Sequence, residues 1–181
     1  MPILSSGTGT VRNITMGSGA TLTVTGATMQ IAGTITTATA GSIDATTGTI
    51  ELAGSTAQAI SGSSFTNRSI RNLKASNSVN VSPAANDSLK ITGVLSFGAS
   101  NKVFNSGNNV ILASTASGTA MVADITNNGA NSGNSFVGNF QVNRYIPARR
   151  AWRLMTAPIA AGAQTINQAW QESVGGTWSS N

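Results

Sequence analysis

Residues 21–52 decide the fold, and they read TLTVTGATMQIAGTITTATAGSIDATTGTIEL. In the first part of this stretch Leu22 and Val24 alternate with threonines. Apolar residues at positions i and i+2 are typical of a strand with one buried face. The same alternation returns along the chain at Met29/Ile31, Ile50/Leu52, Val79/Val81, Leu89/Ile91 and Val110/Leu112. The sequence therefore predicts a string of short strands from Val11 to about Leu112.

The spacing of these pairs indicates how the strands are arranged. Glycine interrupts them every few residues, at Gly26, Gly33, Gly41, Gly48, Gly54 and Gly62. Turns this frequent suit strands of about 4–5 residues and are too close for most sandwiches, in which turns recur about every 8–12 residues. Similar apolar pairs also recur about 20 residues apart, which is the length of one solenoid turn. We therefore expect an all-β fold, a parallel β-solenoid whose short turns, called rungs here, stack on one another.

Composition excludes several other classes. Leu, Glu, Lys and Arg are too rare to build a helical bundle, and no apolar run reaches the ~18 residues of a transmembrane helix. Charged residues make up 8% of the chain, and the net charge of +5 is too dilute to predict a nucleic-acid partner. Stacked rungs explain the low charge, because equivalent positions lie about 4.8 Å apart and like charges would repel.

The chain has no cysteine and no histidine. Disulfides, thiolate metal sites and the commonest general base are therefore excluded, and we expect no cofactor and no metal site. The start, Met1-Pro2-Ile3-Leu4, has neither the basic nor the apolar region of a signal peptide. We expect the chain to be an excised fragment of a longer protein.

Three parts are predicted: solenoid rungs over 1–126, an Asn/Gly/Ser loop over 127–135, and a distinct tail over 136–181. Six of the nine aromatic residues lie in the tail, together with an arginine cluster. The tail is either an aromatic and arginine-rich β cap or the truncated start of a further β domain. A cap would cover the unpaired strand edges of the last rung and bury Trp152 and Leu154.

Two stretches resemble a known family. Gly48–Ile60, reading GTIELAGSTAQAI, with Phe65-Thr66-Asn67 and Ile70-Arg71-Asn72-Leu73 after it, resembles a unit of large surface and secreted proteins of Bacteroidota. Val142–Pro158, reading VNRYIPARRAWRLMTAP, is similar to a second segment of the same proteins and leads, as it does there, into 165–172.

The resemblance implies a location and a role. Many such proteins are exported by type IX secretion and are taken to be adhesins or structural filaments. We therefore expect a non-catalytic structural or adhesive segment of a large cell-surface or secreted bacterial protein, located outside the cell. Surface glycans or further copies of the chain are the expected partners. The alternative is a glycan-binding or ice-binding β-solenoid module.

The residues themselves leave little room for catalysis. Asp44 and Glu51 are the one close pair of acids, but their odd separation and the turn between them make a paired catalytic site unexpected. Arg144, Arg149, Arg150 and Arg153 could form a patch for an anionic ligand. Alternatively, these arginines pack on Tyr145 and Trp152 or reach into solvent.

Threonine pairs raise the question of ice binding. They occur as the triplet Thr21/Thr23/Thr25 and as the pairs Thr34/Thr36 and Thr37/Thr39. A flat ice-binding face needs such a pair on the same side of rung after rung, and Lys90 interrupts the later rungs. Ordinary outward strand threonines are therefore the expected interpretation.

Overall fold

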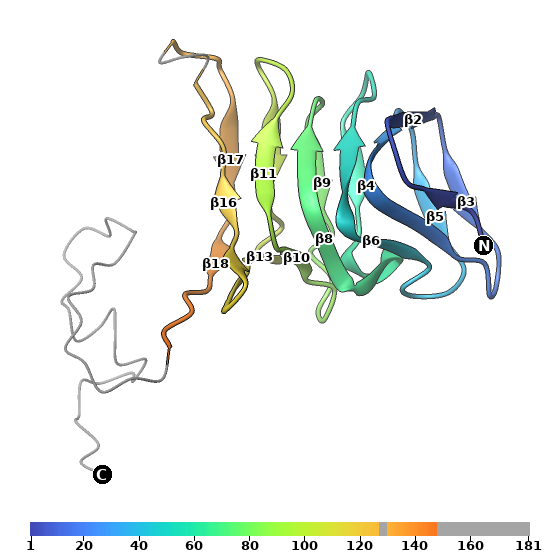
Figure 1. Cartoon of the computed structure of the whole chain (residues 1–181). Helices are drawn as coiled ribbons and strands as arrows, with labels where there is room; N and C mark the ends of the chain where they lie inside the picture. The colour runs from blue at the N-terminus through green and yellow to red at the C-terminus, as the bar shows by residue number, and fades with distance from the viewer. Residues whose placement is uncertain (127–129, 148–181) are drawn as a thin grey trace. The chain divides into compact units, whose positions relative to one another are not determined.

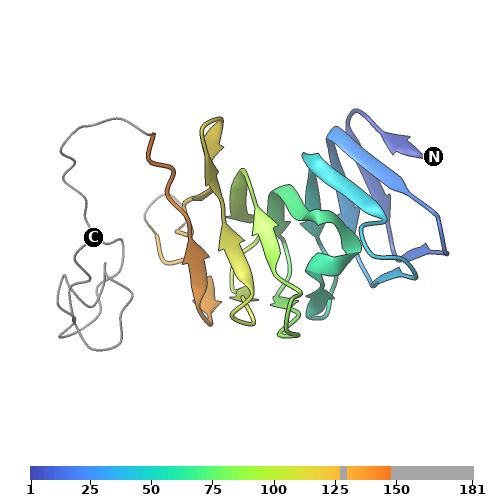
Figure 2. The same ribbon diagram turned by 90° about the horizontal axis from the view of Figure 1, so that it is seen from below.

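Figure 1 shows a computed structural model of the chain, which describes residues 1–126 and 130–147. Met1–Pro147 form one compact unit, and its strands pair in parallel with the strands of the next rung. The unit is a parallel β-solenoid, as the recurrence of apolar pairs predicts. Figure 2 shows the rungs following one another in chain order from the N-terminal strands to the strands drawn in orange.

Each rung contributes to three faces. Face 1 contains β1 (Ile3–Leu4), β10 (Leu89–Ile91), β13 (Val110–Leu112) and β18 (Phe140–Val142). Face 2 contains β2 (Thr8–Val11), β11 (Val94–Phe97) and β16 (Met121–Val122). Three long strands run through both faces, namely β4 (Leu22–Ile31), β6 (Ile43–Leu52) and β8 (Phe65–Ala75). Face 3 contains β3 (Ile14–Met16), β5 (Ile35–Thr37), β7 (Gln58–Ile60), β9 (Val79–Val81), β12 (Val103–Asn105) and β17 (Ser135–Val137). A 3-10 turn, η1 (Gly62–Ser64), precedes β8, and a small hairpin is made of β14 (Ser114–Thr115) and β15 (Gly118–Thr119).

The long strands differ from the predicted strands of four or five residues. In β4 the register to β6 shifts between Thr23 and Thr28, and Gly26 takes a positive φ of 64° there. Gly26 can adopt this left-handed backbone without a steric penalty, so the chain bends while its pairing with the next rung continues. The glycine that predicts a turn therefore marks a corner inside one strand.

Apolar side chains form columns that run through the stack. One column contains Met29, Ile50, Leu73 and Leu95, each paired with the next in the register of the sheet. All four are buried, with at most 7% of the residue exposed. The predicted equivalence of Met29 with Ile50 is confirmed, as is that of Leu89 with Val110. Since a single rung cannot bury its apolar face, these columns hold the rungs together.

Aromatic side chains fill the last part of the described core. Phe104 is fully buried, and its ring centroid lies 5.9 Å from that of Phe136 and 6.0 Å from that of Phe140. Phe136 also lies 5.2 Å from Phe97 and 5.3 Å from Phe140. Phe136 and Phe140 belong to the predicted tail, yet β17 and β18 pair in parallel with β12 and β13. The stack thus continues past the predicted end of the rungs at residue 126.

Several predictions concern residues outside the described ranges. These residues include most of the predicted cap, with Trp152 and Leu154, and residues 127–129 of the predicted loop. In the described part of the chain, no helix is long and apolar enough to cross a membrane.

Candidate functional site

The corner between face 1 and face 2 differs from rung to rung. Ile91 pairs with both Ile70 and Leu112, so these three residues mark the same position in successive rungs. In the rung of β10 and β11 only Thr92 and Gly93 separate the two faces. In the next rung residues 113–120 do so, because Val94 pairs with Met121. The extra residues leave the stack as the hairpin β14–β15.

The hairpin is closed at its base by two buried alanines. The amide of Ala120 donates to the carbonyl of Ala113 at 2.7 Å, and Ser114 pairs with Thr119 in antiparallel register. The hydroxyls of Ser114 and Thr119 lie 2.7 Å apart. Since Ala113 and Ala120 close the loop inside the core, the hairpin can project without disturbing the columns below it.

A groove of about 550 Å³ lies along this corner. The residues that line it come from three successive rungs and from the hairpin: Arg71, Asn72, Thr92, Gly93, Val94, Ala113, Thr115, Ser117, Gly118, Thr119 and Met121. It combines one cation with hydroxyl groups and a small apolar surface. This size is within the range of ligand sites in proteins.

Arg71 supplies the charge of the groove. The side chain of Arg71 is exposed. Among the described residues Glu51 forms its salt bridge with Lys74, and Arg71 has no acidic partner. No acidic residue is among the described residues lining the groove. A planar guanidinium that is free of partners can bind a carboxylate, sulfate or phosphate through two parallel hydrogen bonds.

The wall of the groove at Asn72 is fixed by a contact between rungs. The side-chain oxygen Oδ1 of Asn72 accepts a hydrogen bond from the amide of Val94 at 2.9 Å. A Cβ on Gly93 would lie 2.4 Å from this oxygen and 2.8 Å from the carbonyl of Arg71, closer than real contacts allow. A glycine is therefore needed at position 93 so that the side-chain carboxamide of Asn72 can reach the backbone of the next rung.

The same arrangement occurs at another corner. Oδ1 of Asn13 accepts a hydrogen bond from the amide of Thr34 at 2.9 Å, and a Cβ on Gly33 would lie 2.0 Å from it. An asparagine followed one rung later by glycine is a signal present in the sequence. Glycine in the sequence is interpreted above only as a turn residue, so the contact with asparagine is not predicted.

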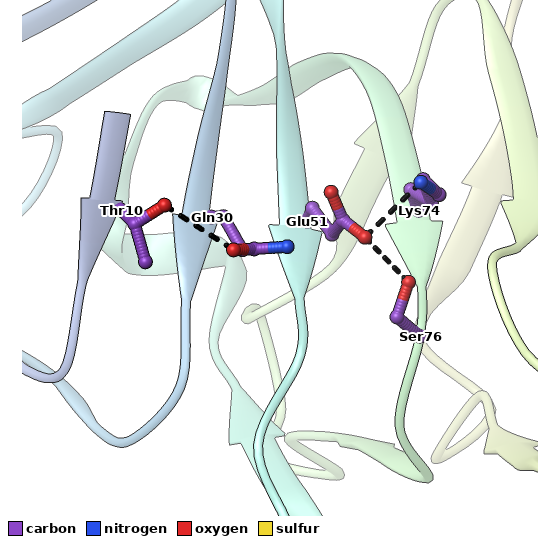
Figure 3. Close-up of polar contacts among 5 residues, drawn as sticks. All are labelled: Thr10, Gln30, Glu51, Lys74 and Ser76. Carbon is purple, nitrogen blue, oxygen red and sulfur yellow. Dashed lines mark hydrogen bonds and ion pairs between the residues drawn. The ribbon is translucent and has the colours of Figure 1, made fainter. Parts of the chain in front are cut away.

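The two acids considered for catalysis are separated by the corner of β6. Oδ1 of Asp44 accepts hydrogen bonds from the amide of Thr46 at 3.0 Å and from its hydroxyl at 2.7 Å. Glu51 lies on face 2, in a column of polar side chains, and Figure 3 shows it between Gln30 and Lys74. Each carboxylate thus has its own structural partners.

Glu51 is held by two side chains of the next rung. It is 7% exposed, its Oε1 accepts a hydrogen bond from the hydroxyl of Ser76 at 2.5 Å, and Nζ of Lys74 lies 3.1 Å from the same oxygen (Figure 3). Burial, the largest single influence, acts to raise the pKa of Glu51. The hydrogen bonds from Ser76 and Lys74, the charge on Lys74 and a contact with Gln30 together outweigh it and lower the pKa below its ordinary value. Glu51 is therefore a stable anion rather than a proton donor.

Asp87 and Asp124 also have lowered pKa values. For Asp87, burial raises the pKa, but hydrogen bonds from Ser61, Ser82 and Ser63 outweigh it. For the exposed Asp124, hydrogen bonds from the hydroxyl and amide of Thr126 lower the pKa. In the residues that the structure describes, no group of three or more acidic side chains is placed to hold a metal ion.

Of the four arginines in the predicted patch, the structure describes only Arg144. Arg144 is exposed and follows β18, next to Tyr145, whose amide donates to the hydroxyl of Ser114 at 2.9 Å. Arg149, Arg150 and Arg153 lie outside the described residues. The groove at Arg71 was not predicted, although the turn-forming residues of 114–119 between two apolar pairs were a visible signal.

The threonine pairs do not stack into a repeated array in the described rungs. Thr23 pairs with Ile3 and Asp44, Thr36 pairs with Thr15, and Thr37 pairs with Met16. Besides the stacked pairs Thr15/Thr36 and Thr25/Thr47, one longer threonine column contains Thr8, Thr28 and Thr49, and Asn72 follows it. The neighbouring column on the same face contains Thr10, Gln30, Glu51 and Lys74. A flat ice-binding surface needs two regular columns, and this face offers one short column.

No family model, curated protein or solved structure matches the chain.

Proposed function

We propose that the chain is a structural or adhesive segment of a large bacterial cell-surface or secreted protein and has no catalytic activity. The observation that carries this proposal is the combination of a continuous parallel stack with acids held in structural hydrogen bonds. Such a stack extends along one axis and presents the same faces on every rung, which suits a spacer that carries binding surfaces.

The polar columns support this interpretation. Thr10 donates a hydrogen bond to Gln30 at 3.2 Å, and Glu51 binds Lys74 and Ser76 on the following rung (Figure 3). These outward side chains therefore tie neighbouring rungs together. A solenoid enzyme that cleaves polysaccharides with paired acids would instead need two carboxylates directed at the same substrate. At least one of them would need a pKa suited to proton transfer.

Two measurements test the proposal. The purified chain is incubated with a panel of neutral and acidic polysaccharides, and released reducing ends and unsaturated uronates are quantified. We expect no turnover. Cleavage that disappears in Asp44→Asn or Glu51→Gln would show that the chain is an enzyme.

The second measurement addresses location. Intact cells of the source bacterium are treated with a protease and probed with an antibody raised against the chain. We expect the signal to be lost from intact cells, as for a surface protein, or to be recovered from the medium. A signal protected until the cells are lysed would overturn the proposal.

A further inference from the structure

We propose that the groove between the hairpin β14–β15 and the preceding corners binds an acidic polysaccharide, with a carboxylate or sulfate of the sugar chain held by Arg71. This inference rests on the adhesive part of the proposed function and names the site and the class of ligand.

The shape of the groove suits a segment of a chain. Its volume of about 550 Å³ is lined by residues from three successive rungs, and it is partly open to solvent. An extended polymer can lie in such a groove without having to enter an enclosed cavity. Its lining includes the hairpin as well as the corner of Arg71 and Asn72.

The charge selects an acidic ligand. Arg71 is the charged residue in the lining and has no ion-pair partner among the described residues. Lys90 adds a second positive charge on face 1, since it pairs with Ser69, two positions before Arg71. A guanidinium binds carboxylate and sulfate oxygens in a fork of two hydrogen bonds, so one acidic sugar is enough to orient the chain.

The rest of the lining suits a sugar better than a nucleic acid. Thr92, Ser117 and Thr119 place hydroxyl groups beside the apolar surfaces of Val94 and Met121, of which Met121 is 58% exposed. A sugar presents hydroxyl groups at its edge and C–H groups on its ring faces, and it needs both kinds of surface. Single-stranded nucleic acid is held by aromatic side chains that stack on bases, and no aromatic residue is among the described residues lining the groove.

Binding is measured by affinity electrophoresis and calorimetry with three probes: polygalacturonate, chondroitin sulfate and neutral dextran. We expect the full chain to bind at least one acidic probe and not dextran. Arg71→Gln should weaken that binding at least about tenfold, the effect of losing a charge-assisted pair of hydrogen bonds. The two acidic probes show whether the groove prefers carboxylate or sulfate.

Two further variants separate this groove from the general positive charge of the chain. Arg12→Gln removes another exposed arginine, at a corner between β2 and β3, and we expect it to leave binding unchanged. In the second variant, 113–120 is replaced by Thr-Gly, the corner of the preceding rung, which removes one wall of the groove. We expect this variant to lose binding while circular dichroism and the melting transition still report a folded stack.

Several results would overturn the inference. They are the absence of binding to both acidic probes, equal losses in Arg71→Gln and Arg12→Gln, or equal binding of single-stranded DNA. In these cases the proposed function is judged separately, because a chain that adheres to cells or surfaces without this groove remains an adhesive segment. Turnover of a polysaccharide, in contrast, would refute the proposed function itself.

Discussion

Two regions of the solenoid build the same stacked core with different spacing along the chain. Between β4 and β6 the paired residues on both faces are 21 positions apart in the chain, as in Leu22 with Ile43 and Met29 with Ile50. Between the rung of β10–β12 and the next, Leu89 still pairs with Val110, but Phe104 pairs with Phe136. The extra residues lie in the hairpin β14–β15 and in the segment before β17.

The core residues of successive rungs therefore keep their register, whereas the segments at the corners differ in length. The entropy lost on closing a loop rises only slowly with its length, so a corner can take an insertion at small expense. A shift of one residue in a strand would instead turn its apolar side chains to solvent. The irregular region is thus also where a groove can form without loss of the stack. If this is correct, substitutions in the core should destabilise the chain most and changes in the hairpin least.

The core of the irregular region should be the most sensitive. Phe104→Ala removes a fully buried ring that contacts Phe136 and Phe140, and we expect unfolding in urea to show a loss of about 3–5 kcal/mol. Phe136→Ala should lose less, because that residue is only half-buried. If Phe136→Ala lowers the free energy of unfolding more than Phe104→Ala does, contacts among the aromatic rings contribute more to stability than burial within the rung.

A short corner should tolerate less change than the inserted one. Gly93→Ala places a methyl group against Oδ1 of Asn72 and the carbonyl of Arg71, and we expect a loss of about 1–3 kcal/mol. Gly118→Ala is the matched control in the hairpin, where a Cβ meets no atom within 4 Å, and it should be nearly neutral.

A double variant tests the contact between Asn72 and Gly93 directly. In an Asn72→Ala background the nearest contact of the new methyl group is gone, so Gly93→Ala should lose less than it does in the natural chain. Additive losses in the thermal melts of the single and double variants would contradict the proposed contact between Asn72 and Gly93.

The polar column of the regular region should make stability depend on pH. Glu51 has a lowered pKa in the folded chain, so between its folded and unfolded pKa values the unfolded state binds more protons. Its contribution is present above the unfolded pKa and is lost as the pH falls through the folded pKa. We expect wild type to lose about 1 kcal/mol more stability than Glu51→Gln between about pH 6 and about pH 3.

Asp87 requires a control in that experiment, since its pKa is also lowered. Asp87→Asn should remove its own part of the pH dependence and leave that of Glu51. Parallel urea titrations of the two single variants and the double variant separate the contributions. Identical pH profiles for wild type and Glu51→Gln would show that the contacts with Lys74 and Ser76 do not stabilise the stack.

The smallest effect is expected for the hairpin. Replacing 113–120 by Thr-Gly preserves the pairing of Leu112 with Ile91 and of Met121 with Val94. We expect the free energy of unfolding to change by less than about 1 kcal/mol. A loss comparable to that of Phe104→Ala would mean that the hairpin supports the core, and that corners and core are not independent.

The sequence alone determined the fold class and much of the core. Alternation of apolar residues is a local property, so Leu22, Val24, Met29 and Ile31 predict buried strand faces without knowledge of their partners. Their recurrence at about the length of one rung then predicts which pairs stack. The structure confirms this for Met29 with Ile50 and for Leu89 with Val110.

The contacts at the corners, in contrast, depend on how the rungs stack. Local periodicity does not show how long each loop is, and loop length sets which residues of successive rungs lie side by side. For this reason the sequence did not reveal that Phe136 packs on Phe104, that Gly93 receives the side chain of Asn72, or that Arg71 lines a groove with Thr119. Stacking of rungs brings together residues that are far apart in the chain, and the contacts that distinguish this solenoid arise there.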